Sequence, residues 1–120
     1  RVQIDHHKPD GQAEASKNAQ ITATIYDSLG MCNFVGPAVK TRLDILAGLV
    51  SARYGVEWTD DDLRELARAT LRAEIAFNRA AGLTEAFDRL PEWFYEEENP
   101  ASGTKFDVSM EDLRNLVAGI

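Results

Sequence analysis

Apolar side chains recur every three or four residues along most of this chain, which is the spacing that places them on one face of an α-helix. The first such stretch covers residues 12–29, and its apolar stripe consists of Ile21, Ile25 and Leu29. Gly30 follows the last apolar position, and a glycine in the left-handed conformation often ends a helix. The pattern therefore predicts a polar lead-in over residues 1–11 and a first helix that ends at Gly30.

Two further stretches predict longer helices in the middle of the chain. The second helix is expected to begin with Pro37, because proline suits the first helical position, and to run to about Arg53. The third is expected to follow Thr59 as its N-cap, with Asp60, Asp61 and Asp62 in a first turn whose positive dipole favours carboxylates, and to end at Gly82. Their apolar stripes are Val39, Leu43, Leu46 and Val50, and then Leu63, Leu66, Ala67, Leu71 and Ile75.

The last part of the chain predicts one more main helix. A short helical turn is expected after Pro91, and Ser109 is expected to cap a final helix with Leu113, Leu116 and Val117 on its inner face. No segment alternates convincingly between apolar and polar residues, as a half-buried strand would. The sequence therefore predicts an all-α, multihelical single domain over residues 12–120, with about four main helices.

Composition excludes several classes of protein. The 120 residues carry a formal net charge of −7, which opposes nucleic-acid binding because phosphates call for a basic surface. The apolar runs are only a handful of residues long, so no membrane span is expected. Cys32 is the only cysteine and cannot form an internal disulfide. A reducing, cytoplasmic setting is therefore expected.

The chemically informative stretch is the end of the first helix, from Asp27 to Cys32. A carboxylate in the last turn of a helix is locally unfavourable, because the helix C-terminus is already partly negative. An electropositive group, or one rich in N–H donors, would compensate. Gly30 lets the backbone reverse without a steric clash, so the carboxylate and the thiol could face the same object beyond the helix end.

This stretch has the form Asp-x-x-Gly-[Leu/Met]-Cys, which resembles the second pterin-binding motif of the tungsten-containing aldehyde ferredoxin oxidoreductases. The resemblance extends from about Ala13 to Phe94 and follows the spacing of that family's C-terminal helical region. A hexapeptide alone is only moderately specific, but the same order of elements over most of the chain is much stronger. The further elements are Gln20, Phe34, Glu74, Phe77, Asn78, Gly82, Asp88, Leu90, Pro91 and Phe94.

The resemblance implies an oxidoreductase. Enzymes of this family oxidise an aldehyde to a carboxylate at a tungsten or molybdenum atom held by two pterin dithiolenes, and a [4Fe–4S] cluster passes the electrons to ferredoxin. By the motif, Asp27 accepts hydrogen bonds from N–H groups of a pterin ring. The backbone of Met31 also meets the pterin, and Cys32 is the fourth thiolate ligand of the cluster.

The chain lacks the family's other cluster motif, Cys-x2-Cys-x3-Cys, as well as a first pterin motif. The resemblance therefore implies a part of a larger enzyme that is completed by the remaining domains and is inactive by itself. Simpler interpretations stay open. Cys32 could be a buried, inert thiol and Asp27 a surface acid, and the chain could be a non-catalytic helical module that docks a partner.

Overall fold

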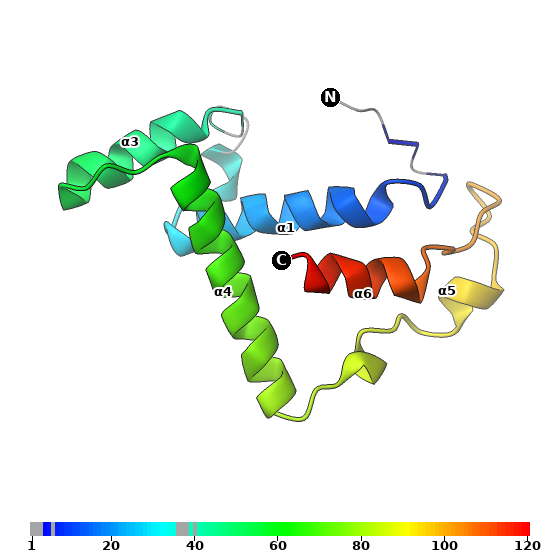
Figure 1. Cartoon of the computed structure of the whole chain (residues 1–120). Coiled ribbons are helices and arrows are strands. Elements are labelled where there is room, and N and C mark those ends of the chain that lie inside the picture. The colour runs from blue at the N-terminus through cyan, green and yellow to red at the C-terminus, as the bar shows by residue number, and fades with distance from the viewer. Residues whose placement is uncertain (1–3, 6, 36–38, 40) are drawn as a thin grey trace. The chain divides into compact units, whose positions relative to one another are not determined.

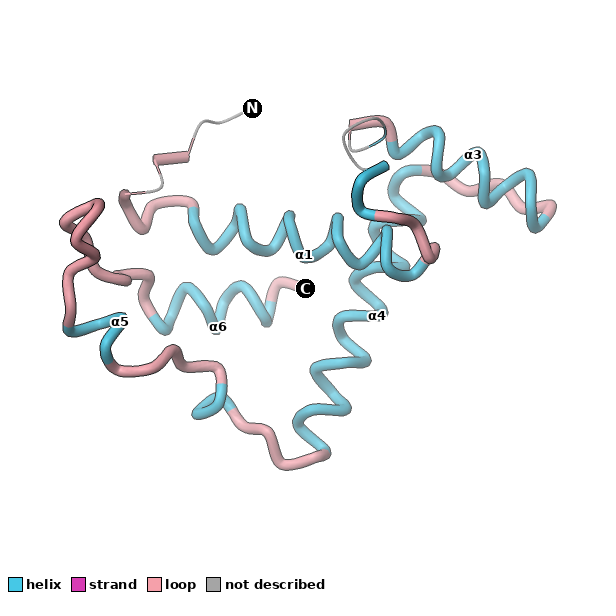
Figure 2. Tube along the Cα trace, turned by 180° about the vertical axis from the view of Figure 1, so that it is seen from behind, coloured by secondary structure: helices cyan, strands magenta, loops and turns pink. Residues whose placement is uncertain are grey.

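The computed structural model describes residues 4, 5, 7–35, 39 and 41–120, and helices are its regular elements (Figure 1). No β-strand occurs in this described part of the chain, so the predicted all-α class is confirmed (Figure 2). The α-helices are α1 (Gln12–Ser28), α3 (Leu43–Tyr54), α4 (Asp60–Ala80), α5 (Trp93–Glu96) and α6 (Met110–Ala118), with short 3₁₀ turns at Asn33–Val35 and Glu85–Phe87.

The chain divides into two compact units. One unit is formed by residues 19–75, which include the end of α1, all of α3 and most of α4. The other is formed by the residues up to 18 together with residues 76–120.

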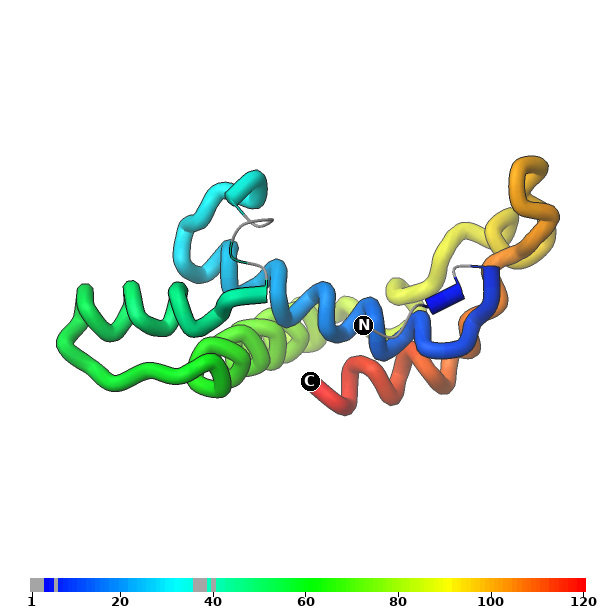
Figure 3. The backbone as a smooth tube through the Cα atoms, turned by 90° about the horizontal axis from the view of Figure 1, so that it is seen from above, coloured from blue at the N-terminus to red at the C-terminus, as the bar shows by residue number. Residues whose placement is uncertain are grey.

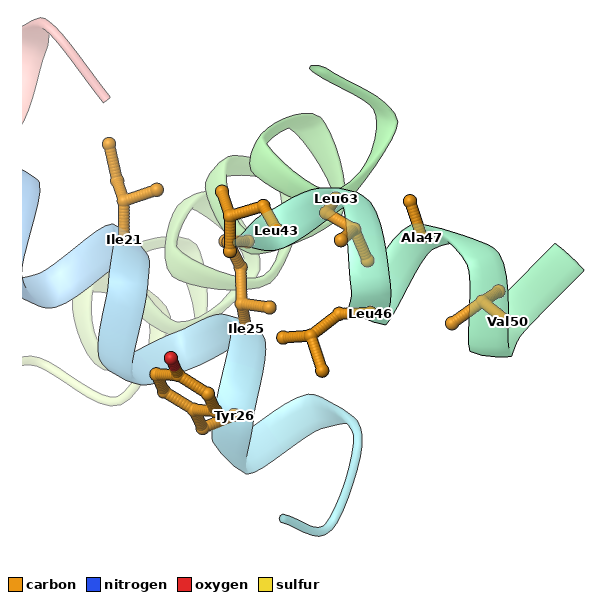
Figure 4. Packing of buried hydrophobic residues seen from close by; sticks show 9 residues of the cluster. Ile21, Ile25, Tyr26, Leu43, Leu46, Ala47, Val50 and Leu63 are labelled. Atoms are coloured by element: carbon orange, nitrogen blue, oxygen red, sulfur yellow. The ribbon is translucent and has the colours of Figure 1, made fainter. Parts of the chain in front are cut away.

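The unit formed by residues 19–75 holds the main apolar core (Figure 4). Ile25, Leu46 and Leu63 are fully buried and come from α1, α3 and α4. Burying one such side chain contributes about 1.5–3 kcal/mol, so this three-helix contact is the main source of the unit's stability. The remaining core residues are Ile21, Tyr26, Leu43, Ala47, Val50 and Ala67, against which Leu29, Met31, Val39, Trp58 and Leu71 pack.

The apolar periodicity located α1 well, but it missed one core residue. The predicted stripe counted Ile21 and Ile25, and both are buried. Tyr26 is also buried, with 3% of its surface exposed, because it lies beside Ile25 on the helix surface and widens the apolar face.

The second predicted helix is interrupted at Thr41 and Arg42. Pro37, the expected first residue, lies outside the described residues, while Thr41 and Arg42 are not helical and α3 begins at Leu43. Arg42 has φ −130° and ψ 58°, outside the helical region, and its guanidinium binds Asp44 with two hydrogen bonds of 2.9 and 2.8 Å. A stretch beginning at Pro37 is therefore interrupted before Leu43.

The predicted end of the second helix near Arg53 is confirmed, because α3 ends at Tyr54. Gly55 closes α3 in the left-handed conformation, with φ 68°. The chain then turns back, and residues 56–59 run along α3 before α4 begins (Figure 3). The Ser51 hydroxyl holds this return, because it accepts a 2.9 Å hydrogen bond from the Trp58 N–H.

Both predicted N-caps are formed with an aspartate three residues later. At the start of α4, the Thr59 N–H and hydroxyl each donate to the Asp62 carboxylate at 2.7 Å. At the start of α6, the Ser109 hydroxyl accepts from the Asp112 N–H at 3.0 Å. Each pair satisfies donors at a helix start that would otherwise lack partners.

In the second unit, the first turns of α1 lie beside α6 (Figures 1 and 2). Leu116 and Ile120 are its buried apolar residues. The segment that leads into α6 is fixed by Phe106, whose N–H donates to the Phe94 carbonyl at 3.0 Å and whose ring packs edge-on against Tyr95 at 5.5 Å.

Candidate functional site

The end of α1 is a complete Schellman turn, in which two hydrogen bonds reverse the backbone. Gly30 has φ 65°, and its N–H donates to the Asp27 carbonyl at 3.1 Å. The Met31 N–H donates to the Tyr26 carbonyl at 2.9 Å. These bonds satisfy carbonyls at the helix end that have no partner within the helix.

Met31 anchors the turn to the core of its unit. Its side chain is partly buried and packs against the core cluster. An apolar contact of the residue after the glycine with the last helical turn commonly accompanies this motif. The position of the turn is therefore fixed both by the backbone bonds and by packing.

Asp27 and Cys32 lie on either side of this anchored glycine turn, and both are exposed. Within the residues that the structure describes, neither an ion pair nor a side-chain hydrogen bond engages the Asp27 carboxylate. The last turn of α1 also contains no basic residue. The negative helix end and the carboxylate are thus not compensated from within α1, so the group stays available to donors outside the chain.

Cys32 directly precedes the 3₁₀ turn Asn33–Val35, and its thiol is exposed. The Cys32 carbonyl accepts the Val35 N–H at 3.0 Å, which holds the backbone on this side. The interpretation of Cys32 as a buried thiol is therefore wrong, because the side chain is exposed. Phe34 follows it with 92% of its surface exposed.

A complete metal site does not occur within the described residues: no three His, Cys, Asp or Glu side chains come together there in a way that could hold a metal ion. The sequence contains one cysteine. The turn at the end of α1 therefore provides one carboxylate and one thiol, which do not make a closed coordination sphere.

The Phe77-Asn78 element ends α4 with a second Schellman turn. The Gly82 N–H donates to the Arg79 carbonyl at 3.0 Å, and the Leu83 N–H donates to the Asn78 carbonyl at 2.9 Å. The asparagine and the glycine of this motif therefore have a structural role in closing α4 at Gly82, as the sequence indicated.

One polar group in this unit escaped the sequence analysis. The Tyr26 hydroxyl is buried and has no hydrogen-bond partner among the described residues. In Figure 4 the Tyr26 ring lies against α1, with its hydroxyl directed toward the Ile21 side. The periodicity of α1 could have indicated that the ring is buried, but it contains no signal for the unpaired hydroxyl.

Within the described part of the chain, no helix is long and apolar enough to cross a membrane. No curated protein and no solved structure matches the chain. The family model described as "Aldehyde ferredoxin oxidoreductase, domains 2 & 3" matches residues 1–117, which is nearly the whole sequence. The chain therefore belongs to the aldehyde ferredoxin oxidoreductase family.

Proposed function

We propose that this chain is a C-terminal helical part of an aldehyde ferredoxin oxidoreductase-like enzyme. In this role it helps bind a tungsten or molybdenum pterin cofactor and supplies one ligand to a [4Fe–4S] cluster. The observation that carries the proposal is the anchored turn at the end of α1, which exposes an uncompensated carboxylate and the chain's only thiol. Family membership supports the choice of cofactors.

Asp27 is the proposed acceptor for the pterin. A carboxylate can accept two parallel hydrogen bonds from adjacent N–H donors on one edge of a planar ring, and the charge strengthens both bonds. The absence of an internal partner within the described residues leaves both oxygens of this exposed side chain available. The N–H donors would also relieve the unfavourable position of the carboxylate at the helix end.

Met31 would contribute its backbone. Its N–H is already bonded to the Tyr26 carbonyl, so the Met31 carbonyl is the group that can accept from a pterin N–H. Its side chain, packed on the core, holds that carbonyl in place. A leucine at this position would pack in the same way.

Cys32 is the proposed ligand of the cluster. A cubane takes four thiolates, and a chain with one cysteine provides one of them. The other three would come from the remaining domains of the enzyme. Because Asp27 and Cys32 flank one short turn, the chain would hold the pterin and the cluster close to each other.

When bound, the metal–pterin group supplies the oxidation of an aldehyde to a carboxylate, and the cluster passes the electrons on to ferredoxin. This chain's residues bind and orient these groups. We assign no acid–base residue to it, and by itself we expect it to be inactive. The partners of this proposal are the other domains and ferredoxin, in the cytoplasm.

The test uses the complete enzyme that contains this segment, purified with its cofactors. Cys32→Ala should remove cluster iron and its electron paramagnetic resonance signal while leaving most of the pterin bound. Asp27→Asn should lower the pterin content and leave the cluster iron and its signal in place. It removes the charge of the pterin acceptor but leaves the thiolate unchanged. Ser28→Ala and Glu57→Gln, two exposed changes in the same unit, are the matched controls.

The proposal fails for Cys32 if the Cys32→Ala enzyme keeps full iron content and normal ferredoxin-linked turnover. It fails for Asp27 if Asp27→Asn and Glu57→Gln retain the same pterin content.

A further inference from the structure

A separate pocket of about 310 Å³ lies in the unit formed by the residues up to 18 and residues 76–120. One wall comes from the lead-in and the first turns of α1, and the other from residues 104–108 and Leu113 of α6. The volume is at the lower end of the range for small-molecule sites. Because all its lining residues lie outside residues 19–75, the pocket is independent of the turn that carries Asp27 and Cys32.

The two walls are held by hydrogen bonds. On one side, the Gln12 side-chain amide donates to the Asp5 carbonyl at 3.1 Å and to the Lys8 carbonyl at 3.2 Å, which fixes the lead-in over the start of α1. On the other side, the Phe106 N–H donates to the Phe94 carbonyl at 3.0 Å. The pocket is therefore a feature of ordered backbone on both sides.

The lining combines an apolar floor with a cationic rim. The half-buried floor is formed by Ala13, Phe106, Val108 and Leu113. Lys8 and Lys105 are exposed at the rim. Such an arrangement can cover an apolar body while leaving a charged group of the ligand at the edge.

The ammonium groups at this pocket belong to Lys8 and Lys105, which are both exposed. Both amide protons of Gln12 are used internally, and the Thr104 hydroxyl is bonded to the Ser102 hydroxyl at 2.8 Å. Lys8 is only loosely paired, at 3.7 Å from Asp5. Within the described residues, the Lys105 ammonium has no ion-pair partner. An anionic group is what these ammonium groups can bind.

We propose that this pocket binds a small organic carboxylate, with its charged group at Lys105 and its apolar body over Phe106 and Leu113. Asp107 also lines the pocket and opposes an anion, so it limits the affinity. The opposite charges of Lys105 and Asp107 predict opposite effects of their removal on binding of the anion. Removing the Lys105 charge weakens binding of the anion, and removing the Asp107 charge strengthens it.

The experiment is an NMR titration of the ¹⁵N-labelled 120-residue chain with 3-phenylpropanoate. The neutral isostere 3-phenylpropanamide serves as the matched ligand. We expect saturable shifts at the pocket residues for the acid, with a dissociation constant on the order of 1 mM, and binding of the amide that is about tenfold weaker. Lys105→Gln should weaken binding of the acid about two- to fivefold and leave binding of the amide unchanged.

Asp107→Asn should tighten binding of the acid about two- to threefold. Lys17→Gln is the control, because Lys17 is a lysine of α1 that does not line this pocket and pairs with Glu14 at 2.6 Å. The spectrum of each variant also reports whether it is folded. The inference is overturned if the acid gives no saturable shifts up to about 20 mM, well above the expected dissociation constant. It is equally overturned if the amide binds as well as the acid, or if Lys105→Gln and Lys17→Gln have the same effect.

Discussion

Gly30 and Gly48 allow the same substitution to be tested in two backbone conformations. Gly30 forms the turn at the end of α1 with φ 65°, whereas Gly48 lies inside α3. An added Cβ atom would meet nothing within 4 Å at either position. Replacement by alanine therefore tests the backbone alone, without a steric clash. We predict that Gly30→Ala lowers the free energy of unfolding and that Gly48→Ala raises it.

The magnitudes follow from the two conformations. A residue with a Cβ pays about 1–2 kcal/mol in the left-handed region, and alanine recovers part of this by restricting the unfolded chain. Gly30→Ala should thus cost about 1 kcal/mol. In a helix interior, alanine is favoured over glycine by about 0.8–1 kcal/mol. The two variants should therefore differ by about 2 kcal/mol.

Thermal unfolding of the 120-residue chain, followed by circular dichroism at 222 nm, measures this difference. For a domain of this size, 1 kcal/mol corresponds to about 4 °C, so the two midpoints should lie about 8 °C apart on opposite sides of the parent chain. Equal shifts in the same direction would refute the reasoning, as would a Gly30→Ala variant more stable than the parent. A more stable Gly30→Ala variant would show that the Schellman turn does not hold the end of α1.

Three further predictions concern single side chains. Tyr26→Phe should leave the unfolding midpoint unchanged or raise it, because the buried hydroxyl has no partner and its desolvation costs about 1–3 kcal/mol; a clear loss of stability would mean that the hydroxyl is bonded. The Thr59 hydroxyl and N–H lower the pKa of Asp62, so the stability that this carboxylate contributes is full above the unfolded pKa of about 3.9 and is lost as the pH falls through the lower folded pKa. Asp62→Asn should accordingly flatten the dependence of the midpoint on pH below about pH 4, whereas Asp61→Asn, which lacks this cap, should follow the parent curve. The exposed Cys32 should react with a thiol reagent in the folded chain as fast as in urea, and much slower labelling of the folded chain would contradict its exposure.

Local signals explain why much of the helical structure could be predicted. The end of α1 follows from Gly30, because glycine tolerates the left-handed conformation that closes the turn. The starts of α4 and α6 follow from Thr59 and Ser109, whose hydroxyls cap the next turn. Each of these signals acts within a few residues, so the sequence carries them directly.

The start of α3 shows where local signals were insufficient. Pro37 lies outside the described residues, but the conformation of Arg42 interrupts the predicted helix, and the pairing of Arg42 with Asp44 occurs next to the start of α3 at Leu43. A proline preference of this kind is a weak indication. It does not define where the core of the unit requires the helix to begin.

The candidate site likewise has features that the sequence predicts and features that depend on tertiary contacts. The order of Asp27, Gly30, Met31 and Cys32 is a property of the sequence, and together with the further elements up to Phe94 it indicated the family and the proposed ligands. That Asp27 and Cys32 are both exposed, while Met31 is packed against the core between them, depends on contacts with α3 and α4. Periodicity contains no information about such contacts, because the partner residues are distant in the sequence.

The sequence by itself determined the all-α class, the helix ends and the pattern of chemistry at the end of α1, because hydrophobic period, capping and glycine conformation are local properties. Only the tertiary structure decided that the buried Tyr26 hydroxyl has no partner among the described residues, and that a pocket with a cationic rim forms where the lead-in meets residues 104–108. Burial and cavities arise when segments far apart in the chain pack together. Side-chain packing and hydrogen-bond geometry then determine which groups are buried and where a cavity remains. Composition does not contain this information.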